Sequence, residues 1–254
     1  MPDRDNLKES DIHSRMQDAD TVAQVADFLI KSDSNDGHTL KQIGLALNAA
    51  GDLPRCQEIL EMAQMLVPLS ASTELALAEC YVAAGNADLA IGLLDHIARS
   101  ASVETATLLR VASLFKEINC NREAWLTCRE AIRKSPDDAQ AWFDLSIYMG
   151  RLGFPFSKVE RVIQQAIDLE PDNVVFRVSL AAGLLKLGRE PHAYALVRRF
   201  GEKELRQICC SNCLENLRAL YEQADDWQCV SLCNEQIVQR NITEARGCCE
   251  APEE

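Results

Sequence analysis

Hydrophobic residues recur at helical spacing along most of the chain, most clearly between residues 139 and 173. A first predicted helix has one apolar face, formed by Trp142, Leu145, Ser146 and Met149. A second has a similar face, formed by Val159, Ile163 and Ala166. Pro171 ends this second helix because it cannot continue the helical hydrogen bonding, and Asp172 or Asn173 can cap the next helix. The pattern predicts two amphipathic helices closed by a proline turn.

The same pattern recurs in phase along the chain. Five units start at residues 37, 71, 105, 139 and 174, so the spacings are 34, 34, 34 and 35 residues. Pro54, Pro155 and Pro191 each fall in the first turn of a second helix, where a missing N–H costs little. A less regular sixth unit starts near Ser211.

This order of large, small, aromatic, alanine and proline positions resembles a tetratricopeptide repeat (TPR), a helix–turn–helix unit of 34 residues. The resemblance covers residues 37 to about 207. It implies an all-α fold, a right-handed superhelical solenoid in which each repeat packs on its neighbours.

The expected domain organisation follows from this register. It comprises a flexible N-terminus at 1–17, a packing helix and loop at 18–36, five TPR repeats at 37–207, a degenerate sixth repeat or capping helices at 208–240, and a disordered tail at 241–254. A terminal repeat is expected to depart from the consensus because nothing stacks on its outer face.

Charge and composition narrow the range of functions. Hydrophobic residues make up 47 % of the chain and aromatic residues 6 %, and the formal net charge is −13. Such an acidic surface repels phosphates, so neither nucleic acid nor an anionic membrane is an expected partner. The first residues lack the apolar core of a signal peptide, and no later run is long enough to span a membrane. We therefore expect a cytoplasmic protein.

The sequence offers little catalytic chemistry. It contains no phosphate-binding Gly-x-x-x-x-Gly-Lys, no Gly-x-Gly-x-x-Gly, no Gly-x-Ser-x-Gly and no His-Glu-x-x-His motif. The four histidines lie far apart in the sequence, at His13, His38, His96 and His192. The expectation is a protein that is not an enzyme and that holds no cofactor or catalytic metal.

The cysteines leave an alternative open. Seven of the eleven lie between residues 209 and 249, and Cys210-x₂-Cys213 followed by Cys229-x₃-Cys233 superficially resembles a four-thiolate zinc site. The repeat register places the two pairs at opposite ends of a helical hairpin, roughly 15 Å apart over about ten residues of helix. The alternatives are a metal- or thiol-redox-responsive protein and a set of buried or incidental thiols.

The TPR resemblance also implies a binding surface, because first helices line the concave groove in that family. Mapping the groove positions onto this chain gives a candidate peptide-binding set: Lys41, Leu75, Leu109, Arg110, Lys116, Phe143, Ile147, Arg151, Val178 and Lys186. Apolar and basic side chains together favour an acidic or carboxylate-ended segment. The alternative is that these lysines and arginines are ordinary solvated helix positions.

The resemblance therefore implies a non-catalytic protein–protein interaction module, an adaptor, scaffold or chaperone-like protein that binds a peptide or protein segment in its groove. The carboxylate clamp that some TPR proteins use on chaperone tails is only partly present. Lys41 and Arg110 fit that clamp, but three other positions are apolar, at Leu45, Ala76 and Ala106. Self-association is a further alternative.

Overall fold

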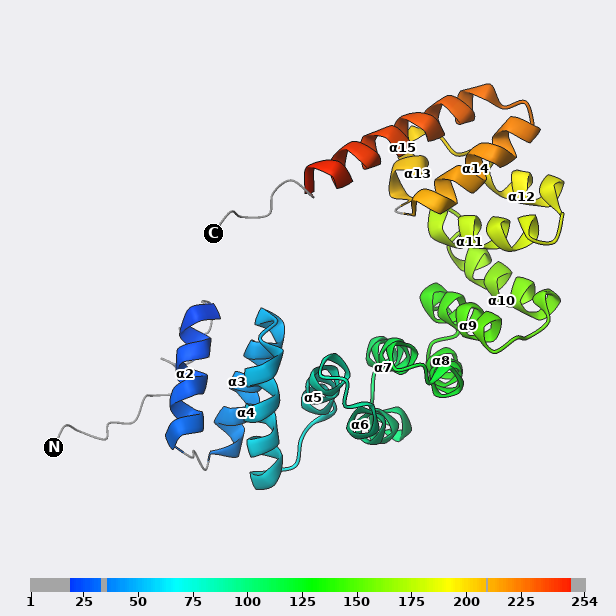
Figure 1. Cartoon of the computed structure of the whole chain (residues 1–254). Helices are drawn as coiled ribbons and strands as arrows, with labels where there is room; N and C mark the ends of the chain where they lie inside the picture. The colour runs from blue at the N-terminus through cyan, green and yellow to red at the C-terminus, as the bar shows by residue number, and fades with distance from the viewer. Residues whose placement is uncertain (1–18, 33–35, 209, 248–254) are drawn as a thin grey trace. The chain divides into compact units, whose positions relative to one another are not determined.

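The computed structural model describes residues 19–32, 36–208 and 210–247, which form fourteen helices and no strand (Figure 1). The all-α expectation is confirmed. The expected flexible N-terminus at 1–17 lies outside the described residues, as does most of the loop that follows the first helix. The chain divides into two compact units, Met1–Pro136 and Asp137–Glu254.

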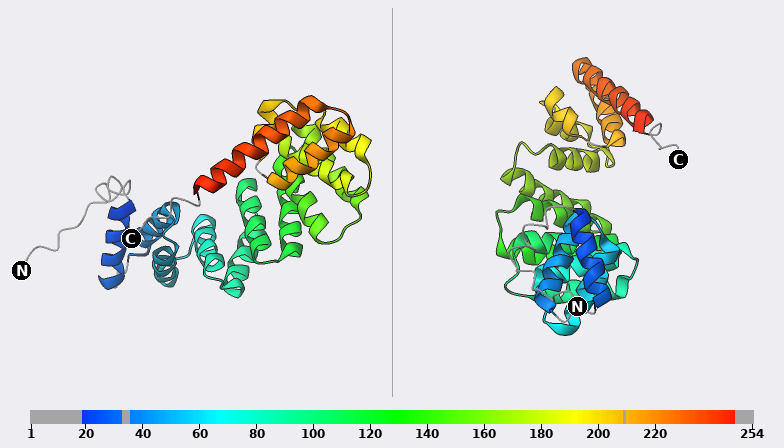
Figure 2. Two further views of the ribbon diagram at one scale, coloured as in Figure 1. Left: turned by 45° about the horizontal axis from the view of Figure 1, so that its top comes forward. Right: turned by 90° about the vertical axis from the view of Figure 1, so that its left-hand side faces the viewer.

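Unit 1 contains a single helix followed by three helical hairpins. The helices are α2 (Ala19–Ser32), α3 (Gly37–Ala50) and α4 (Leu53–Leu66), α5 (Ala71–Ala83) and α6 (Ala87–Arg99), and α7 (Thr105–Glu117) and α8 (Asn121–Lys134). Helix α2 packs on α3 and α4, and each hairpin packs on the next one along the chain (Figures 1 and 2).

Unit 2 contains three further hairpins and one short extra helix. The helices are α9 (Ala139–Arg151) and α10 (Phe156–Leu169), α11 (Val174–Leu185) and α12 (Glu190–Val197), α13 (Glu202–Gln207), and α14 (Ser211–Gln223) and α15 (Trp227–Gly247). The first helices of the five regular repeats thus begin at the residues where the sequence pattern predicts each repeat to start.

Every hairpin turns through a residue in the left-handed backbone region. These residues are Gly51, Gly85, Asn119, Gly153, Gly188 and Asp225. Counted from the first residue of α3, α5, α7, α9, α11 and α14, each is the fifteenth of its repeat. Glycine reaches positive φ without strain, and asparagine and aspartate are the residues that tolerate it next best. The sixth hairpin therefore has the same turn geometry as the regular repeats.

Small residues set the distance between the two helices of a hairpin. A Cβ added to Gly44 of α3 would lie 2.6 Å from Cγ of Leu60 on α4, and both residues are buried. Aspartate, serine and asparagine side chains cap several first helices, including Asp36 on α3 and Asn173 on α11. Close packing and capping explain why these segments form helical pairs.

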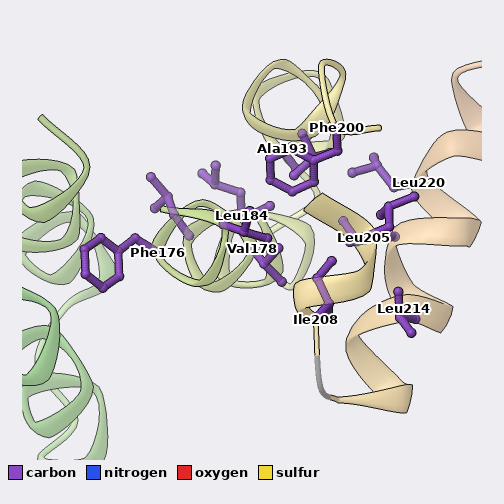
Figure 3. Packing of buried hydrophobic residues seen from close by; sticks show 14 of the residues in the cluster. Phe176, Val178, Leu184, Ala193, Phe200, Leu205, Ile208, Leu214 and Leu220 are labelled. Atoms are coloured by element: carbon purple, nitrogen blue, oxygen red, sulfur yellow. The ribbon is translucent and has the colours of Figure 1, made fainter. Parts of the chain in front are cut away.

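The core of unit 2 extends from α9 to α15. Figure 3 shows its part between Phe176 of α11 and Leu220 of α14. Phe176 and Tyr221 are among its largest fully buried side chains. Leu145, Ser146 and Met149 are buried as the pattern predicts, whereas Trp142 is only partly buried at the edge of this core.

The fifth repeat departs from the regular pattern. Its second helix, α12, stops after eight residues, and α13 follows where a regular repeat would have only a connection. Side chains from other helices bind the carbonyl groups at this break. Tyr221 donates a hydrogen bond of 2.8 Å to the Val197 carbonyl, and Arg177 donates to the Leu196 carbonyl. These donors replace the helical hydrogen bonds that α12 would otherwise continue.

The last helix is longer than the expected sixth repeat. Helix α15 continues to Gly247, whereas the sequence analysis placed residues 241–254 in a disordered tail. Residues 241–246 contain neither glycine nor proline, and Glu244, Ala245 and Arg246 are good helix formers, so nothing ends the helix before Gly247. Residues 248–254 lie outside the described part, and the other domain boundaries remain predictions.

Gly44→Ala should destabilise the protein by about 1–2 kcal/mol, because the strain of overpacking against Leu60 exceeds the helix propensity that alanine adds. Gly92→Ala is the matched control. Gly92 also lies within a helix, but nothing lies within 4 Å of an added Cβ, so this change should stabilise by about 0.5–1 kcal/mol. Thermal unfolding followed by circular dichroism measures both. Equal effects of the two changes would contradict the close contact.

Tyr221→Phe should lower the free energy of unfolding by about 0.5–1.5 kcal/mol, because the buried Val197 carbonyl loses one of its two donors and keeps only the Phe200 backbone N–H. Tyr194→Phe is the control, since its hydroxyl bonds to Asp226 in a partly exposed setting. Urea unfolding of both variants tests this. A smaller effect at Tyr221 than at Tyr194 would mean that the carbonyl at the α12 break does not depend on this hydrogen bond.

Candidate peptide-binding surface

Five predicted binding residues lie on the first helices of unit 1. Lys41 is on α3, Leu75 is on α5, and Leu109, Arg110 and Lys116 are on α7. Arg110 is exposed, and the other four are half-buried. The Lys41 ammonium lies 3.4 Å from the Pro68 carbonyl, so it is held near the connection between the first two repeats.

A chain of polar contacts joins these three first helices. Asn48 of α3 donates a 2.8 Å hydrogen bond to Glu79 of α5, and Arg110 of α7 forms an ion pair of 2.6 Å with the same carboxylate. The Arg110 guanidinium also lies 3.9 Å from the carboxylate of Glu117. We call Asn48, Glu79, Arg110 and Glu117 the polar ladder. It shows that the three first helices present one continuous surface.

The polar ladder changes the expected electrostatics of the surface. Arg110 has a carboxylate on two sides, so its charge is already balanced within unit 1. An acidic partner must therefore compete with Glu79 or Glu117. Both ladder contacts between helices join residues 31 positions apart, three fewer than the repeat length. Opposite charges at this interval were the sequence signal that could have revealed the ion pair.

Two predicted binding residues of unit 2 are core residues. Phe143 is 7 % exposed and stacks on Phe176, with 4.6 Å between the ring centroids. Val178 is 6 % exposed and belongs to the same core as Leu205 and Ile208 at α13 (Figure 3). Phe143 and Val178 are therefore largely covered by other side chains, and their part in binding stays a prediction. The extra helix α13 and the aromatic stack cover positions that a regular repeat would leave accessible.

The other three predicted residues of unit 2 are exposed. Ile147 is 37 % exposed on α9, Arg151 is the last residue of α9, and Lys186 follows the end of α11. Their part in binding stays a prediction.

Two of the four C-terminal cysteines that the structure describes are interior residues. Cys229 and Cys233 are buried in the core of unit 2, and the Cys229 thiol lies 3.6 Å from the Phe200 carbonyl. Cys210 is exposed at the start of α14, where its sulfur accepts a hydrogen bond from the Cys213 backbone N–H. Within the described residues, no three His, Cys, Asp or Glu side chains come together as a metal site would require.

Within the same described residues, every helix is too short or too polar to cross a lipid bilayer.

Comparisons with known proteins agree with the helical-repeat architecture. No protein-family profile and no curated sequence matches the chain. The solved structure of PilF from Pseudomonas aeruginosa is similar with a TM-score of 0.61 and 17 % identity, over 80 % of this chain and 90 % of PilF. MamA is similar with a TM-score of 0.55 and 17 % identity, over 64 % of this chain and 88 % of MamA.

A third similar structure is that of YrrB, described as a TPR protein with an unusual peptide-binding site. Its TM-score is 0.54 at 11 % identity, over 72 % of this chain and 95 % of YrrB. Identities this low establish the fold and carry no functional residue from one protein to another. The resemblance that the repeat pattern indicated is confirmed at the level of the fold: the chain is a TPR-like α-helical repeat protein.

Proposed function

We propose that the protein is a non-catalytic interaction module, and that unit 1 binds an extended protein segment along α3, α5 and α7. The observation that carries this proposal is the polar ladder, which joins three successive first helices into one surface. Leu45 on α3 is 37 % exposed, and Leu75 and Leu109 are half-buried, so apolar contacts are available there too. A segment of several residues can contact equivalent positions of successive repeats.

The partner segment is acidic in this proposal. An incoming carboxylate can replace Glu117 at Arg110, because the 3.9 Å contact to Glu117 is longer than the 2.6 Å contact to Glu79. Lys41 on α3 and Lys116 on α7 add positive charge to the same set of first helices. Ile147, Arg151 and Lys186 offer a second, smaller set of accessible side chains within unit 2.

An adaptor or scaffold in the cytoplasm fits this proposal, with another protein as partner. The acidic composition opposes nucleic acid and anionic membranes as partners. The similarity to YrrB, described as having a peptide-binding site, supports peptide recognition as the mode. Self-association through the same surface is an outcome that the binding experiment distinguishes.

Arg110→Gln should weaken binding of acidic peptides by up to about fivefold, because an exposed ion pair contributes roughly 0–1 kcal/mol. Glu117→Gln should strengthen the same binding, because it removes the competing carboxylate. The measurement selects peptides from a random display library on the wild-type protein and then titrates the selected acidic peptides at two ionic strengths. Wild-type affinity should fall as salt rises.

Arg133→Gln is the matched control for these titrations. Arg133 lies on a second helix, α8, and pairs with Glu130 at 2.6 Å, so it reproduces the charge chemistry of Arg110 away from the ladder. Equal losses in the Arg110 and Arg133 variants would show that only net charge matters. Unchanged affinity in the Arg110 variant would place the binding surface elsewhere, and light scattering on the same samples would report self-association.

The C-terminal cysteines support the interaction proposal over a metal-responsive one. Burial raises the pKa of Cys229 to about 11 and that of Cys233 to about 12, and Asp226 adds to the effect on both. A metal ligand must be a thiolate, so these shifts oppose metal binding near neutral pH.

The same shifts predict a loss of stability at alkaline pH. An unfolded cysteine titrates near pH 8.5, so between about pH 8.5 and 11 the unfolded state loses protons that the folded state keeps, and stability falls as pH rises. Cys233→Ala should make this fall shallower, whereas Ser231→Ala, at an exposed position of the same helix that carries no titratable group, should leave its slope unchanged. Melting temperatures from pH 8 to 10 test this. Equal slopes in the wild type and the Cys233 variant would contradict the raised pKa.

A further inference from the structure

Helix α15 exposes a row of side chains along one side. The helix packs on α13 and α14 (Figure 1). Trp227, Ser231, Asn234 and Val238 are exposed, and the exposed fractions of Trp227 and Val238 are 63 % and 56 %. At about 100° per residue, these four positions fall within about 60° of one another around the helix axis. They form one stripe, which we call the α15 stripe.

The α15 stripe differs from an ordinary solvated helix face. None of its four side chains carries a charge, although the chain as a whole has a net charge of −13. Glu235 is exposed but lies on the flank of the stripe, about 80° around the helix from Trp227. Tryptophan is among the residues most enriched in the energetically important parts of protein interfaces. An uncharged stripe offers nothing to select a charged ligand, so its contacts must come from shape and apolar area.

The order of residues along the stripe is the same in both directions. The successive intervals from Trp227 to Val238 are four, three and four residues, and the residue types are large apolar, small polar, small polar and large apolar. A second α15 that runs antiparallel therefore places Trp227 of each copy against Val238 of the other. The same arrangement places Ser231 of each copy against Asn234 of the other, and a hydroxyl and an amide can share a hydrogen bond. Every pairing occurs twice, as a twofold symmetric interface requires.

A hollow in the surface lies beside Val238. Its volume is about 350 Å³, and it is lined by Ser231, Asn234, Glu235, Val238 and Gln239. In the antiparallel arrangement the Trp227 ring of the second copy lies over Val238, where this hollow can receive it. The Glu235 carboxylate at the hollow is an acceptor for the indole N–H, which usually has a partner when it is buried. One helix thus presents both a large side chain and a hollow for it, eleven residues apart.

We propose that the α15 stripe is a self-association surface, at which two copies of this chain pair through antiparallel α15 helices. The second copy is the occupant because its stripe supplies the matching intervals, the ring and the hollow. One helix per copy makes a small interface, so the dimer is weak, with a Kd on the order of 50 µM. The stripe belongs to a second helix of unit 2, so this inference goes beyond the function proposed for unit 1 and does not depend on it.

The first experiment measures the molecular mass of the reduced, full-length protein by sedimentation velocity. A reductant excludes disulfides between copies, since the chain has eleven cysteines. Between about 1 and 500 µM, a range that spans the expected Kd, the mass should rise from 28.2 kDa toward twice that value. Added salt should strengthen the dimer, because it screens the repulsion between two acidic copies. A monomer at every concentration would overturn the proposal, as would a dimer that weakens with salt, the behaviour expected of an acidic segment bound to unit 1.

An exchange of charges tests the antiparallel pairing. Trp227→Glu and Val238→Lys should each weaken dimerisation at least tenfold, because each variant alone puts an unpaired charge at both ends of the interface. An equimolar mixture of the two variants should recover a heterodimer. At one end of this heterodimer the introduced carboxylate faces the introduced ammonium, and at the other end the original tryptophan faces the original valine. A parallel pair would bring like positions together, so the mixture would not recover association.

Val175→Lys is the matched control. Val175 is also an exposed valine of unit 2, but it lies on α11, so this variant should dimerise like the wild type. Circular dichroism confirms that each variant keeps its helices. Dimerisation that neither α15 variant weakens would place the contact elsewhere and overturn the proposal. A mixture of the two α15 variants that stays monomeric would overturn the antiparallel pairing.

Discussion

The tight chain reversal at the fifteenth residue of each repeat is the constraint on which the other contacts depend. A left-handed residue at this place sends the second helix back along the first within a very short connection. That return brings Leu60 over Gly44, which only a residue without a side chain allows. It also fixes the axial position of each first helix, so that residues 31 positions apart on neighbouring first helices of unit 1 meet. Asn119 and Asp225 keep this geometry where glycine is missing, at a small conformational cost.

The local signals of the sequence were sufficient to predict the helical pairs. Proline, glycine and helix-capping residues act within a few positions of themselves, so the starts of the five regular first helices follow from the pattern alone. The break after α12 could not be predicted in this way. It depends on Tyr221 and Arg177, which bind the Val197 and Leu196 carbonyls from positions 24 and 19 residues away. The residue spacing within a single repeat gives no information about hydrogen-bond partners that lie this far away in the sequence.

The difference between local signals and contacts that are distant in the sequence also explains why the predicted binding residues lie in different settings, some at the surface and some in the core. Position within a repeat predicts which side of a first helix a residue occupies, and this was sufficient to bring Arg110 into contact with neighbouring first helices. Position within a repeat does not predict which other residues cover that side of the helix. Phe143 and Val178 occupy groove positions by register, but an aromatic partner and the α13 segment cover them. Helix α13 exists only because the fifth repeat is irregular, so the regular pattern could not indicate its effect.

Contacts between neighbouring repeats of unit 1 are of two kinds, one at the surface and one in the interior. On the first helices, side chains 31 residues apart meet at the surface in one hydrogen bond, from Asn48 to Glu79, and one ion pair, between Arg110 and Glu79. Between α4 and α5 the contact is internal, and Cys56 and Cys80 are both buried there. Because repeats contact mainly their neighbours, α5 takes part in both sets of contacts. Glu79 of the polar ladder and the buried Cys80 are adjacent residues of that helix, so one short stretch of backbone positions both the surface carboxylate that holds Arg110 and the interior contact with α4.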